Sequence, residues 1–554
     1  MLKTMKKIIK NKLKHGTSSS LLIVAILIST LQSCVKDNFQ INKIATVQWD
    51  PNVAAPLVYS SLSIKDMLNN TGGQALVVEA ADKSLTLVYK SSLFSMNASD
   101  LVNLPDQTLP FSAPIGAALP VPFNVGSVFT VNNSQTVPFG SGVAGPLIDS
   151  ITYKAGIFVF SFASDLHNSG SILITIPKLK KKGIAFSKIL PLNYTNTVPV
   201  LADSNYDLTG YDLDLTQGGA PYNQFVINYA VTFNGSTTAA SNSDQIAVSL
   251  SMVNMQFSKL FGYIGQQDLS IPSDTIDLSV FTNAAGAASF TLKDPTVKVT
   301  ISNSYGMPID FRIPVFEGYN PGVNFYPITG LPSPIPIHSP NINQVGQILV
   351  DSFSLNTANG SNIATIINNT PKKIVYKVDA HTNPAGATQH NFIIDSSQFK
   401  MDVEFDLPLY GTAKNFLLVD SIPFTFSQSI PDQVQSGLIR TYNSNGFPMD
   451  IDLQVYFVDS LYNVLDSLVS PNQILLKSGV VNATTGLVTS PTSTIFDATV
   501  DKARLLKLKN AKNLVIKAIA NTTNSGATDV KIYSDYKLDF KLGVQVQMHV
   551  QIKR

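Results

Sequence analysis

The chain is long, weakly charged and almost free of cysteine. It has 554 residues, of which 39 are Lys or Arg and 37 are Asp or Glu. Charged residues make up 14% of the chain, against about a quarter in an average globular protein. One hydrophobic core does not support this length, so several domains are expected. The single cysteine excludes a disulfide within the chain.

The N-terminus has the pattern of an export signal. The first 14 residues hold six lysines and no acid, and an uncharged stretch over residues 16–33 follows, with its apolar centre at residues 21–28. A helix that spans a bilayer needs roughly 20 apolar residues, whereas the core of a signal peptide needs roughly 7 to 15. The length therefore predicts a cleaved leader, residues 1–33.

The leader ends in Leu31-Gln32-Ser33-Cys34. This sequence resembles the lipobox of bacterial lipoproteins, with a branched aliphatic residue three positions before the cysteine and a small residue directly before it; Gln32 departs from the small residue more common there. The resemblance implies a signal peptide cut before Cys34, lipidation of Cys34 with diacylglycerol and further acyl chains such as palmitate, and an outer-membrane lipoprotein. Two or more acyl chains hold a protein stably on a membrane. The alternative is an unmodified thiol after an ordinary secretory signal.

Charge is unevenly distributed in the mature chain. Without the leader, 33 basic residues stand against 37 acids, a net charge of −4. Residues 502–554 hold 11 Lys or Arg and three Asp, so this end carries +8 and residues 34–501 carry −12. The asymmetry indicates an acidic partner or anionic head groups for residues 502–554. The alternative is a solvated strand face that uses lysine.

The composition and its periodicity predict an all-β fold. Glutamate occurs three times, and Val, Ile, Thr, Ser, Phe and Tyr replace the strong helix formers. Apolar and polar residues alternate over short runs, most clearly at residues 542–552, and this period places one face of each strand on a core. Clusters of Gly, Pro and Asn separate the runs, as turns require.

Three short patterns recur in the same order. An Asn-Ser turn starts at positions 168, 303 and 443; a strand beginning with Ile or Leu starts at 227, 374 and 514; and Asp-Ser/Thr-Ile starts at 149, 274 and 420. The turn and strand patterns both indicate a period near 140 residues, which is too long for a solenoid and suits a complete β-sandwich domain.

The sequence therefore predicts three tandem Ig-like β-sandwich modules after an irregular N-terminal part. The expected boundaries are 34–148 for a membrane-proximal segment, 149–270 for module 1, 274–418 for module 2 and 420–554 for a basic module 3. No flexible Gly/Ser linker separates them, so we expect a semi-rigid row.

One loop has the oxygen-rich spacing of a calcium ligand set. Its candidate ligands are Asp203, Asn205, Asp207, Asp212 and Asp214. The sharp turn of an EF-hand needs Gly where this loop has Leu208, and the sequence around Asp212 alternates as a strand does. We therefore expect no metal site in this loop, and the alternative is a calcium site. No other cofactor is expected.

No stretch of the sequence assembles a catalytic motif. The six histidines include no zinc-binding spacing, no nucleophile elbow or phosphate loop occurs, and glutamate is scarce. Tyr206, Tyr211 and Tyr222 could stack on sugars, although aromatic residues in strands more often form a core. The basic run at residues 178–182 is expected to be a solvated turn, and no nucleic acid partner is expected.

These patterns predict a non-enzymatic, lipid-anchored structural or interaction module of adhesin-like character. We expect the protein on the outer membrane. It could face the periplasm or the cell surface, and the cell surface is favoured. The first alternative is a surface lipoprotein that binds glycans for polysaccharide capture. The second is a hydrolase with an unrecognised Asp-based site.

Overall fold

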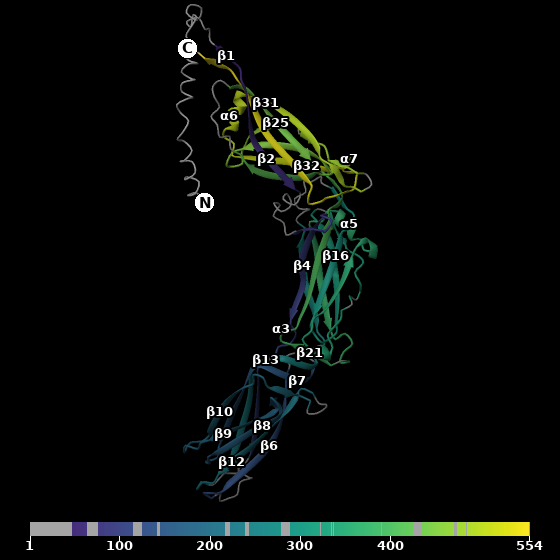
Figure 1. Ribbon diagram of the computed structural model, residues 1–554. Coiled ribbons are helices and arrows are strands. Elements are labelled where there is room, and N and C mark those ends of the chain that lie inside the picture. Colours follow the sequence, from purple (N-terminus) through teal and green to yellow (C-terminus); the bar gives the residue numbers. More distant parts are fainter. Residues whose placement is uncertain are drawn as a thin grey trace, which may run out of the picture.

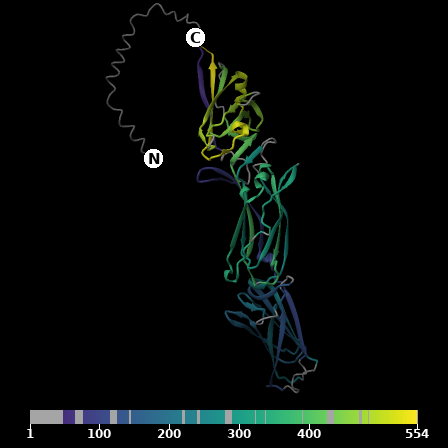
Figure 2. The same cartoon turned by 90° about the vertical axis from the view of Figure 1, so that its right-hand side faces the viewer.

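The computed structural model is a rod of three β-modules, with the two ends of the described chain together at one end of the rod (Figure 1). It describes residues 47–63, 76–114, 124–140, 145–216, 222–238, 243–278, 289–321, 323–333, 335, 337–388, 390–424, 434–469, 474–482 and 485–552. Figure 2 shows the same elongated arrangement from the side. We name the modules proximal, middle and distal by their position relative to the chain ends. The all-β fold predicted from the sequence is confirmed.

The distal module contains eight main strands in two four-stranded arrays, which a short ninth strand joins into one continuous sheet. In chain order they are β5 (Gln107–Pro114), β6 (Val128–Pro138), β7 (Leu147–Ser164), β8 (Gly170–Lys181), β9 (Ile184–Leu192), β10 (Val200–Asp207), β12 (Gln224–Asn234) and β13 (Gln245–Tyr263). Their pairing gives β5-β13-β7-β10 and β6-β12-β8-β9. The short β11 (Asp212–Asp214) joins β7 to β8.

The middle module repeats this pattern. Its strands are β4 (Leu85–Asn97), β14 (Asp268–Asp277), β16 (Thr296–Asn303), β17 (Ile309–Asn320), β18 (Val323–Pro327), β19 (Leu349–Leu355), β20 (Lys373–Thr382) and β22 (Gln398–Pro408). The sheets are β4-β22-β16-β19, with β3 (Leu76–Glu79) added beside β4, and β14-β20-β17-β18. The short helices are α3 (Ala98–Leu101), η5 (Ile342–Gln344), η6 (Thr357–Asn359) and α5 (Ile363–Asn368).

The proximal module repeats the pattern again. Its strands are β2 (Asn52–Ser63), β24 (Phe416–Pro423), β25 (Val434–Asn445), β26 (Met449–Val458), β27 (Val464–Ser467), β31 (Thr492–Asp501), β32 (Asn513–Thr522) and β34 (Lys537–Met548). The sheets are β2-β34-β25-β31 and β24-β32-β26-β27. The additional elements are β28 (Ile474–Leu476), β29 (Val480–Val481), β30 (Val488–Ser490), α6 (Lys502–Leu508) and α7 (Thr523–Gly526).

All three modules share one topology. Numbered within a module, one sheet has the order first, eighth, third, sixth, and the other has second, seventh, fourth, fifth. This is the strand order of a jelly roll, in which eight strands of two Greek keys form a double-sheet sandwich. The predicted β-sandwich architecture therefore agrees with these modules. The expected Ig-like fold is corrected, because an Ig domain has seven to nine strands in a different order.

The modules are nested rather than tandem. The first strand of the proximal module, β2, ends at Ser63, and its second strand, β24, begins at Phe416; the other two modules lie between them in the chain. In the same way β4 and β14 of the middle module enclose the distal module. The predicted segment 34–148 is corrected accordingly, because its strands β2, β4 and β5–β6 belong to three different modules.

The remaining predicted boundaries fall close to observed strands. The expected module starts at 274 and 420 lie inside the second strands, β14 and β24, and the start at 149 lies inside the third strand, β7. The recurring strand pattern marks the seventh strand of each module: β12, β20 and β32. Strands two to eight are contiguous in the middle and proximal modules, and this contiguity produces the period near 140 residues.

The strands form because their residues alternate between core and surface. In β20, for example, Ile374, Tyr376, Val378 and Ala380 are buried, and the residues between them are half-exposed. One continuous core fills the distal and middle modules and a second fills the proximal module. Burial of the apolar positions is the main force that selects these strands.

Paired backbone joins the modules to one another. The end of β13 pairs with β21 (Asn391–Ile394), which connects the distal and middle modules. The middle and proximal modules share a small sheet of β15 (Ser289–Leu292), β23 (Tyr410–Lys414) and β33 (Val530–Lys531). These junctions favour the semi-rigid row that the sequence predicts.

Candidate functional site

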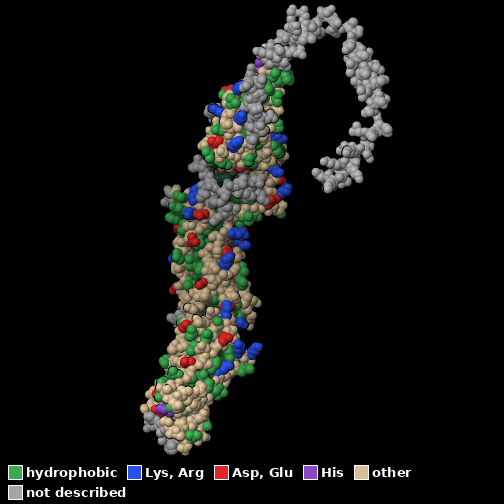
Figure 3. Space-filling view, turned by 90° about the vertical axis from the view of Figure 1, so that its left-hand side faces the viewer, with side chains coloured by type: hydrophobic (Ala, Val, Ile, Leu, Met, Phe, Trp, Pro, Cys, Tyr) green, Lys and Arg blue, Asp and Glu red, His purple; other side chains and the backbone are tan. Residues whose placement is uncertain are grey.

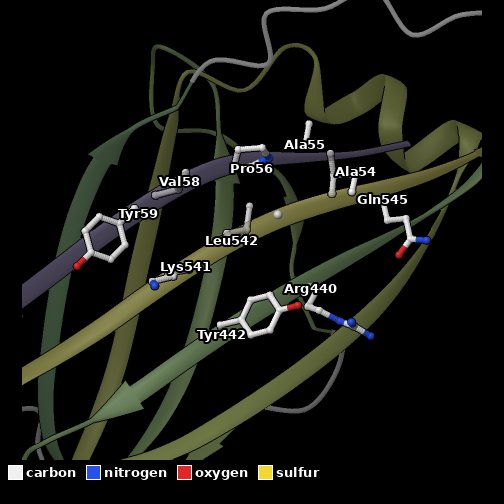
Figure 4. Close-up of a pocket in the computed structure, with 12 residues that line it drawn as sticks. Ala54, Ala55, Pro56, Val58, Tyr59, Arg440, Tyr442, Lys541, Leu542 and Gln545 are labelled. Atoms are coloured by element: carbon white, nitrogen blue, oxygen red, sulfur yellow. The ribbon is translucent and has the colours of Figure 1, made fainter. Parts of the chain in front are cut away.

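A hollow of about 570 Å³ opens on the outer face of the proximal module (Figure 4). Its lining comes from three neighbouring strands, β2, β34 and β25. The residues are Ala54, Ala55, Pro56, Val58, Tyr59, Arg440, Tyr442, Lys541, Leu542, Gly543, Val544 and Gln545. Segments almost 500 residues apart in the chain thus form one surface, because β34 pairs with β2 on one side and with β25 on the other.

The strand register arranges the outward side chains in rows. One row is Tyr59, Lys541 and Tyr442, and the next is Pro56, Gly543 and Arg440. Gly543 is therefore the next residue after Lys541 on this face of β34, and it leaves the floor of the hollow without a side chain. A Cβ at this position would meet the Ala55 carbonyl oxygen at 3.5 Å, an ordinary contact. The fold does not require glycine there, and glycine is unfavourable inside a strand.

Two tyrosine rings border the hollow with their faces accessible. Tyr59 is 66% exposed and Tyr442 is 46% exposed. The Lys541 ammonium nitrogen lies 5.3 Å from the centroid of the Tyr59 ring, within the range of a cation–π contact. Figure 4 shows the two rings on the same side of the sheet, with Lys541 between their strands.

A fixed ion pair stands at the side of the hollow. Arg440 donates from Nε and from an Nη to the two carboxylate oxygens of Asp497, at 2.6 Å each. These hydrogen bonds hold the pKa of Asp497 below its ordinary value and raise the pKa of Arg440, with a further contribution from the Tyr442 hydroxyl. The two-point contact fixes the plane of the guanidinium.

This arrangement offers aromatic faces and hydrogen-bond donors for binding. Among the described residues that line the hollow there is no His, Cys, Ser, Asp or Glu. Accessible aromatic faces attract apolar ring faces, and Arg440, Lys541 and Gln545 supply hydrogen bonds at the rim. A saccharide combines these two properties, an apolar ring face and a rim of hydroxyl groups.

The residues of the hollow do not stand out in the sequence. The alternation of Arg440 and Tyr442 along β25 predicts that both side chains lie on one face of that strand. Tyr59 and Gly543 become neighbours of these residues only because β34 pairs with both β2 and β25.

The structure does not gather the candidate calcium ligands. Asp203, Asn205 and Asp207 alternate along the exposed face of β10, where extended backbone keeps neighbouring side chains about 7 Å apart. Asp207 accepts hydrogen bonds from the amide and the hydroxyl of Thr209. Within the described residues no group of three or more His, Cys, Asp or Glu side chains could hold a metal ion.

The other two candidates lie on β11, next to different partners. Asp212 accepts a hydrogen bond from the Thr152 hydroxyl at 2.6 Å. Asp214 forms an ion pair with Lys178 at 2.7 Å. Each of these two carboxylates thus has a protein partner of its own.

The predicted aromatic platform is mostly packed against the protein. Tyr206 and Tyr211 are half-buried, and their rings meet Phe186 edge-on at 5.3 and 5.9 Å between centroids. Tyr222 is half-buried beside a smaller pocket of about 120 Å³ near His390. The interpretation of Tyr206 and Tyr211 as core-edge residues is therefore favoured over the sugar platform.

The histidines of the described chain are separate from one another. Each of four forms a hydrogen bond with an aspartate: His338 with Asp351, His381 with Asp268, His390 with Asp149 and His549 with Asp50. His167 instead meets the ring of Tyr194. Cys34 and the leader lie outside the described residues.

Comparison with known proteins gives little further guidance. No family model matches the sequence, and no curated protein matches it. Among solved structures, the chain is similar to a protein from Parabacteroides distasonis described as secreted, at 13% identity and a TM-score of 0.28, over 52% of this chain and 89% of the other. The Faustovirus major capsid protein is similar at 8% identity and a TM-score of 0.06, over 95% of this chain and 94% of the other. Likenesses this weak carry no argument about function. In the described part of the chain no helix is long and apolar enough to cross a membrane.

Proposed function

We propose that this protein is an exported lipoprotein that is fixed to a membrane through Cys34 and acts as a non-enzymatic binding module of the cell envelope. The observation that carries the proposal is the pairing of β1 (Val47–Trp49) with β35 (Val550–Ile552). Both ends of the described chain lie at the same end of the rod (Figure 1). An anchor at the N-terminus therefore holds the rod by one end and leaves the distal module free to project.

The length of the connection supports this geometry. Twelve residues lie between Cys34 and Val47, so thirteen residue-to-residue steps connect them. An extended chain spans at most about 3.3–3.6 Å per residue, so the anchor lies within roughly 45 Å of β1. The distal module is attached only through the two other modules, so the anchored protein presents it farthest from the membrane.

Fractionation of cells tests the anchor. The protein should be found with the membranes, and Cys34→Ser should release it into the soluble fraction after a high-salt wash. Retention of Cys34→Ser through that wash would show that the lipid anchor is not what holds the protein. Protease treatment of intact cells and of cells with an opened outer membrane then tells whether the rod faces outward, as the sequence favours, or into the periplasm.

A second candidate function is glycan capture, which the hollow on the proximal module favours. It presents the faces of Tyr59 and Tyr442 beside the fixed guanidinium of Arg440, and its floor is open at Gly543. Aromatic stacking with hydrogen bonds at the ring edge suits a saccharide.

A binding assay against a panel of polysaccharides tests this candidate. Gly543→Val places a branched side chain on the floor, where the sheet accepts it, and Tyr442→Ser removes one ring face. Each should weaken binding by about ten-fold or more, the equivalent of about 1.4 kcal/mol. Tyr462→Asn, an exposed tyrosine outside the hollow, is the matched control and should bind normally. Unchanged binding by both hollow variants would exclude this site, and hydrolysis of a polysaccharide would support the Asp-based hydrolase instead.

A further inference from the structure

The end of the rod that carries both chain termini also carries several exposed apolar side chains. The β26–β27 hairpin and the segment after α6 meet there, because the Lys512 amide donates to the Val458 carbonyl and β26 ends opposite Asn513. In the adjoining sheet, Asn52 and Asp501 lie in the same row of paired residues. Asn52 is three residues after Trp49, and Asp501 directly precedes α6. We call this surface the terminal face; it comprises residues 49, 459–463 and 502–512.

The hairpin holds two apolar residues outward. Leu461 is 79% exposed and Tyr462 is 59% exposed. The Asp459 carboxylate fixes their backbone, because it accepts hydrogen bonds from the amides of Leu461 and Asn463 at 2.8 and 2.9 Å and from the Asn463 side chain at 3.0 Å. The hairpin is thus a preformed projection, and burying these side chains would not require it to fold.

Two more apolar side chains accompany the hairpin. Leu506 on α6 is 46% exposed, whereas Leu505 and Leu508 of the same helix are buried and attach it to the core. Trp49 is 61% exposed on β1. Tryptophan and tyrosine are the side chains that favour the interface between water and lipid.

Three lysines on α6 or directly after it belong to the same face. Lys507, Lys509 and Lys512 are exposed, and none has an ion-pair partner among the residues that the structure describes. Arg504 is different, because it is bound to Asp466. Lys and Arg side chains are visible over the proximal module in Figure 3. The excess positive charge of residues 502–554 therefore includes free ammonium groups at the terminal face.

We propose that the terminal face rests on an anionic phospholipid surface, with Leu461, Tyr462, Leu506 and Trp49 in the head-group region and the three lysines against the phosphates. Insertion of apolar side chains and attraction of lysines to anionic lipids both strengthen binding to such a surface. The inference builds on the proposed lipid anchor, since that anchor brings this face, rather than another, to the membrane. The rod then stands on the membrane through two kinds of contact, the acyl chains and the terminal face.

Vesicle binding by the unlipidated mature protein tests the proposal without the anchor. The protein is residues 34–554 with Cys34→Ser, and the probes are vesicles of phosphatidylcholine alone or with one third phosphatidylglycerol. Trp49 is the only tryptophan of the chain, so its fluorescence reports on this face alone. We expect co-sedimentation with the anionic vesicles, a blue shift of the emission and quenching by lipids with brominated chains, all reduced at high salt.

Two variants divide the proposed contacts. Lys507→Gln with Lys509→Gln should weaken partitioning by about 25-fold, from about five-fold for each lysine near an anionic surface. Leu461→Ser with Tyr462→Asn should weaken it by about ten-fold or more, through lost apolar insertion; asparagine suits the left-handed backbone at residue 462, whose φ is 63°.

The matched control lies on the distal module. Lys182→Asn with Ile184→Ser changes another hairpin that has a left-handed lysine, with φ of 52°, and an isoleucine that is 75% exposed. It should bind vesicles as the parent protein does.

Three outcomes would overturn the proposal: no binding to anionic vesicles, equal binding to neutral ones, or equal loss in the distal control. A dimer that the hairpin variant abolishes would assign the face to a second copy of the chain. None of these results touches the lipid anchor, which the fractionation of Cys34→Ser tests separately.

Discussion

Replacement of Asn445 should destabilise the proximal module strongly. Asn445 is 1% exposed at the end of β25, and its amide closes the connection to β26. The side-chain nitrogen donates to the carbonyl oxygens of Met449 and Lys477 at 2.8 and 2.9 Å, and the side-chain oxygen accepts from the Phe447 amide at 2.9 Å. The side chain thus satisfies three backbone groups at once.

The expected loss follows from these three bonds. A typical hydrogen bond contributes about 1 kcal/mol net, and a buried backbone group left without a partner costs about 1–3 kcal/mol. Asn445→Ala should therefore lower the free energy of unfolding of this module by about 3 kcal/mol. Asn445→Asp should cost more, because it keeps the acceptor for Phe447 but places a second oxygen against two carbonyl oxygens.

Denaturant unfolding followed by Trp49 fluorescence measures this effect, because Trp49 belongs to the sheet pair next to the proximal module. A three-module rod need not unfold in one step, so a local probe is required. The control is Asn303→Ala. Asn303 plays the same role in the middle module, accepting from the Tyr305 amide at 2.9 Å and donating to the His338 carbonyl at 3.1 Å. A loss below 1 kcal/mol in Asn445→Ala, or an aspartate variant more stable than the alanine variant, would refute the reasoning.

Four further variants have defined outcomes. Tyr153→Phe should stabilise the distal module by about 1–2 kcal/mol in thermal unfolding, because burial raises the pKa of Tyr153 and its hydroxyl has no partner among the described residues; Tyr305→Phe should instead destabilise by about 1 kcal/mol, since that hydroxyl donates to the Met96 carbonyl at 2.9 Å. The hydrogen bonds from Arg440 lower the pKa of Asp497 from 3.8, so their stabilising effect is complete above about pH 4 and is lost as the pH falls through the lowered pKa. An Asp497→Asn variant compared with the parent by pH-dependent unfolding should show a constant difference from pH 5 to 8 that shrinks below pH 4, and a difference that grows in acid would contradict the assignment. Leu505→Ala should cost about 2–5 kcal/mol, because this side chain is fully buried under α6; an unchanged midpoint of denaturant unfolding would show that α6 is not attached through it.

Alternation in the sequence was sufficient to predict strands but not their partners. Residues 542–552 show the period of two plainly, and the structure places β34 and β35 there. The same alternation cannot tell that β34 lies between β2 and β25, almost 500 and about 100 residues away. A period of two reports which face of a strand is buried, and it contains no information about the strand beside it.

The recurring turn at Asn303 and Asn443 shows the same limit. The spacing aligns these two residues, but the buried amide that closes the turn in the proximal module is Asn445, two positions later. The connection from third to fourth strand is three residues long there and five in the middle module, so equivalent polar contacts come from different positions.

The sequence by itself determined the all-β fold, the number of repeated modules and the basic character of the C-terminal end, because composition and periodicity act over a few neighbouring residues. Only the tertiary structure decided that the modules are nested, that residues 34–148 supply a first strand to each of them, and that Tyr59, Gly543 and Arg440 share one hollow. The physical reason is that strand pairing joins backbone groups without regard to their separation in the chain. When the chain leaves a module and returns hundreds of residues later, the strands on either side of the excursion form the same backbone hydrogen bonds as strands joined by a tight turn.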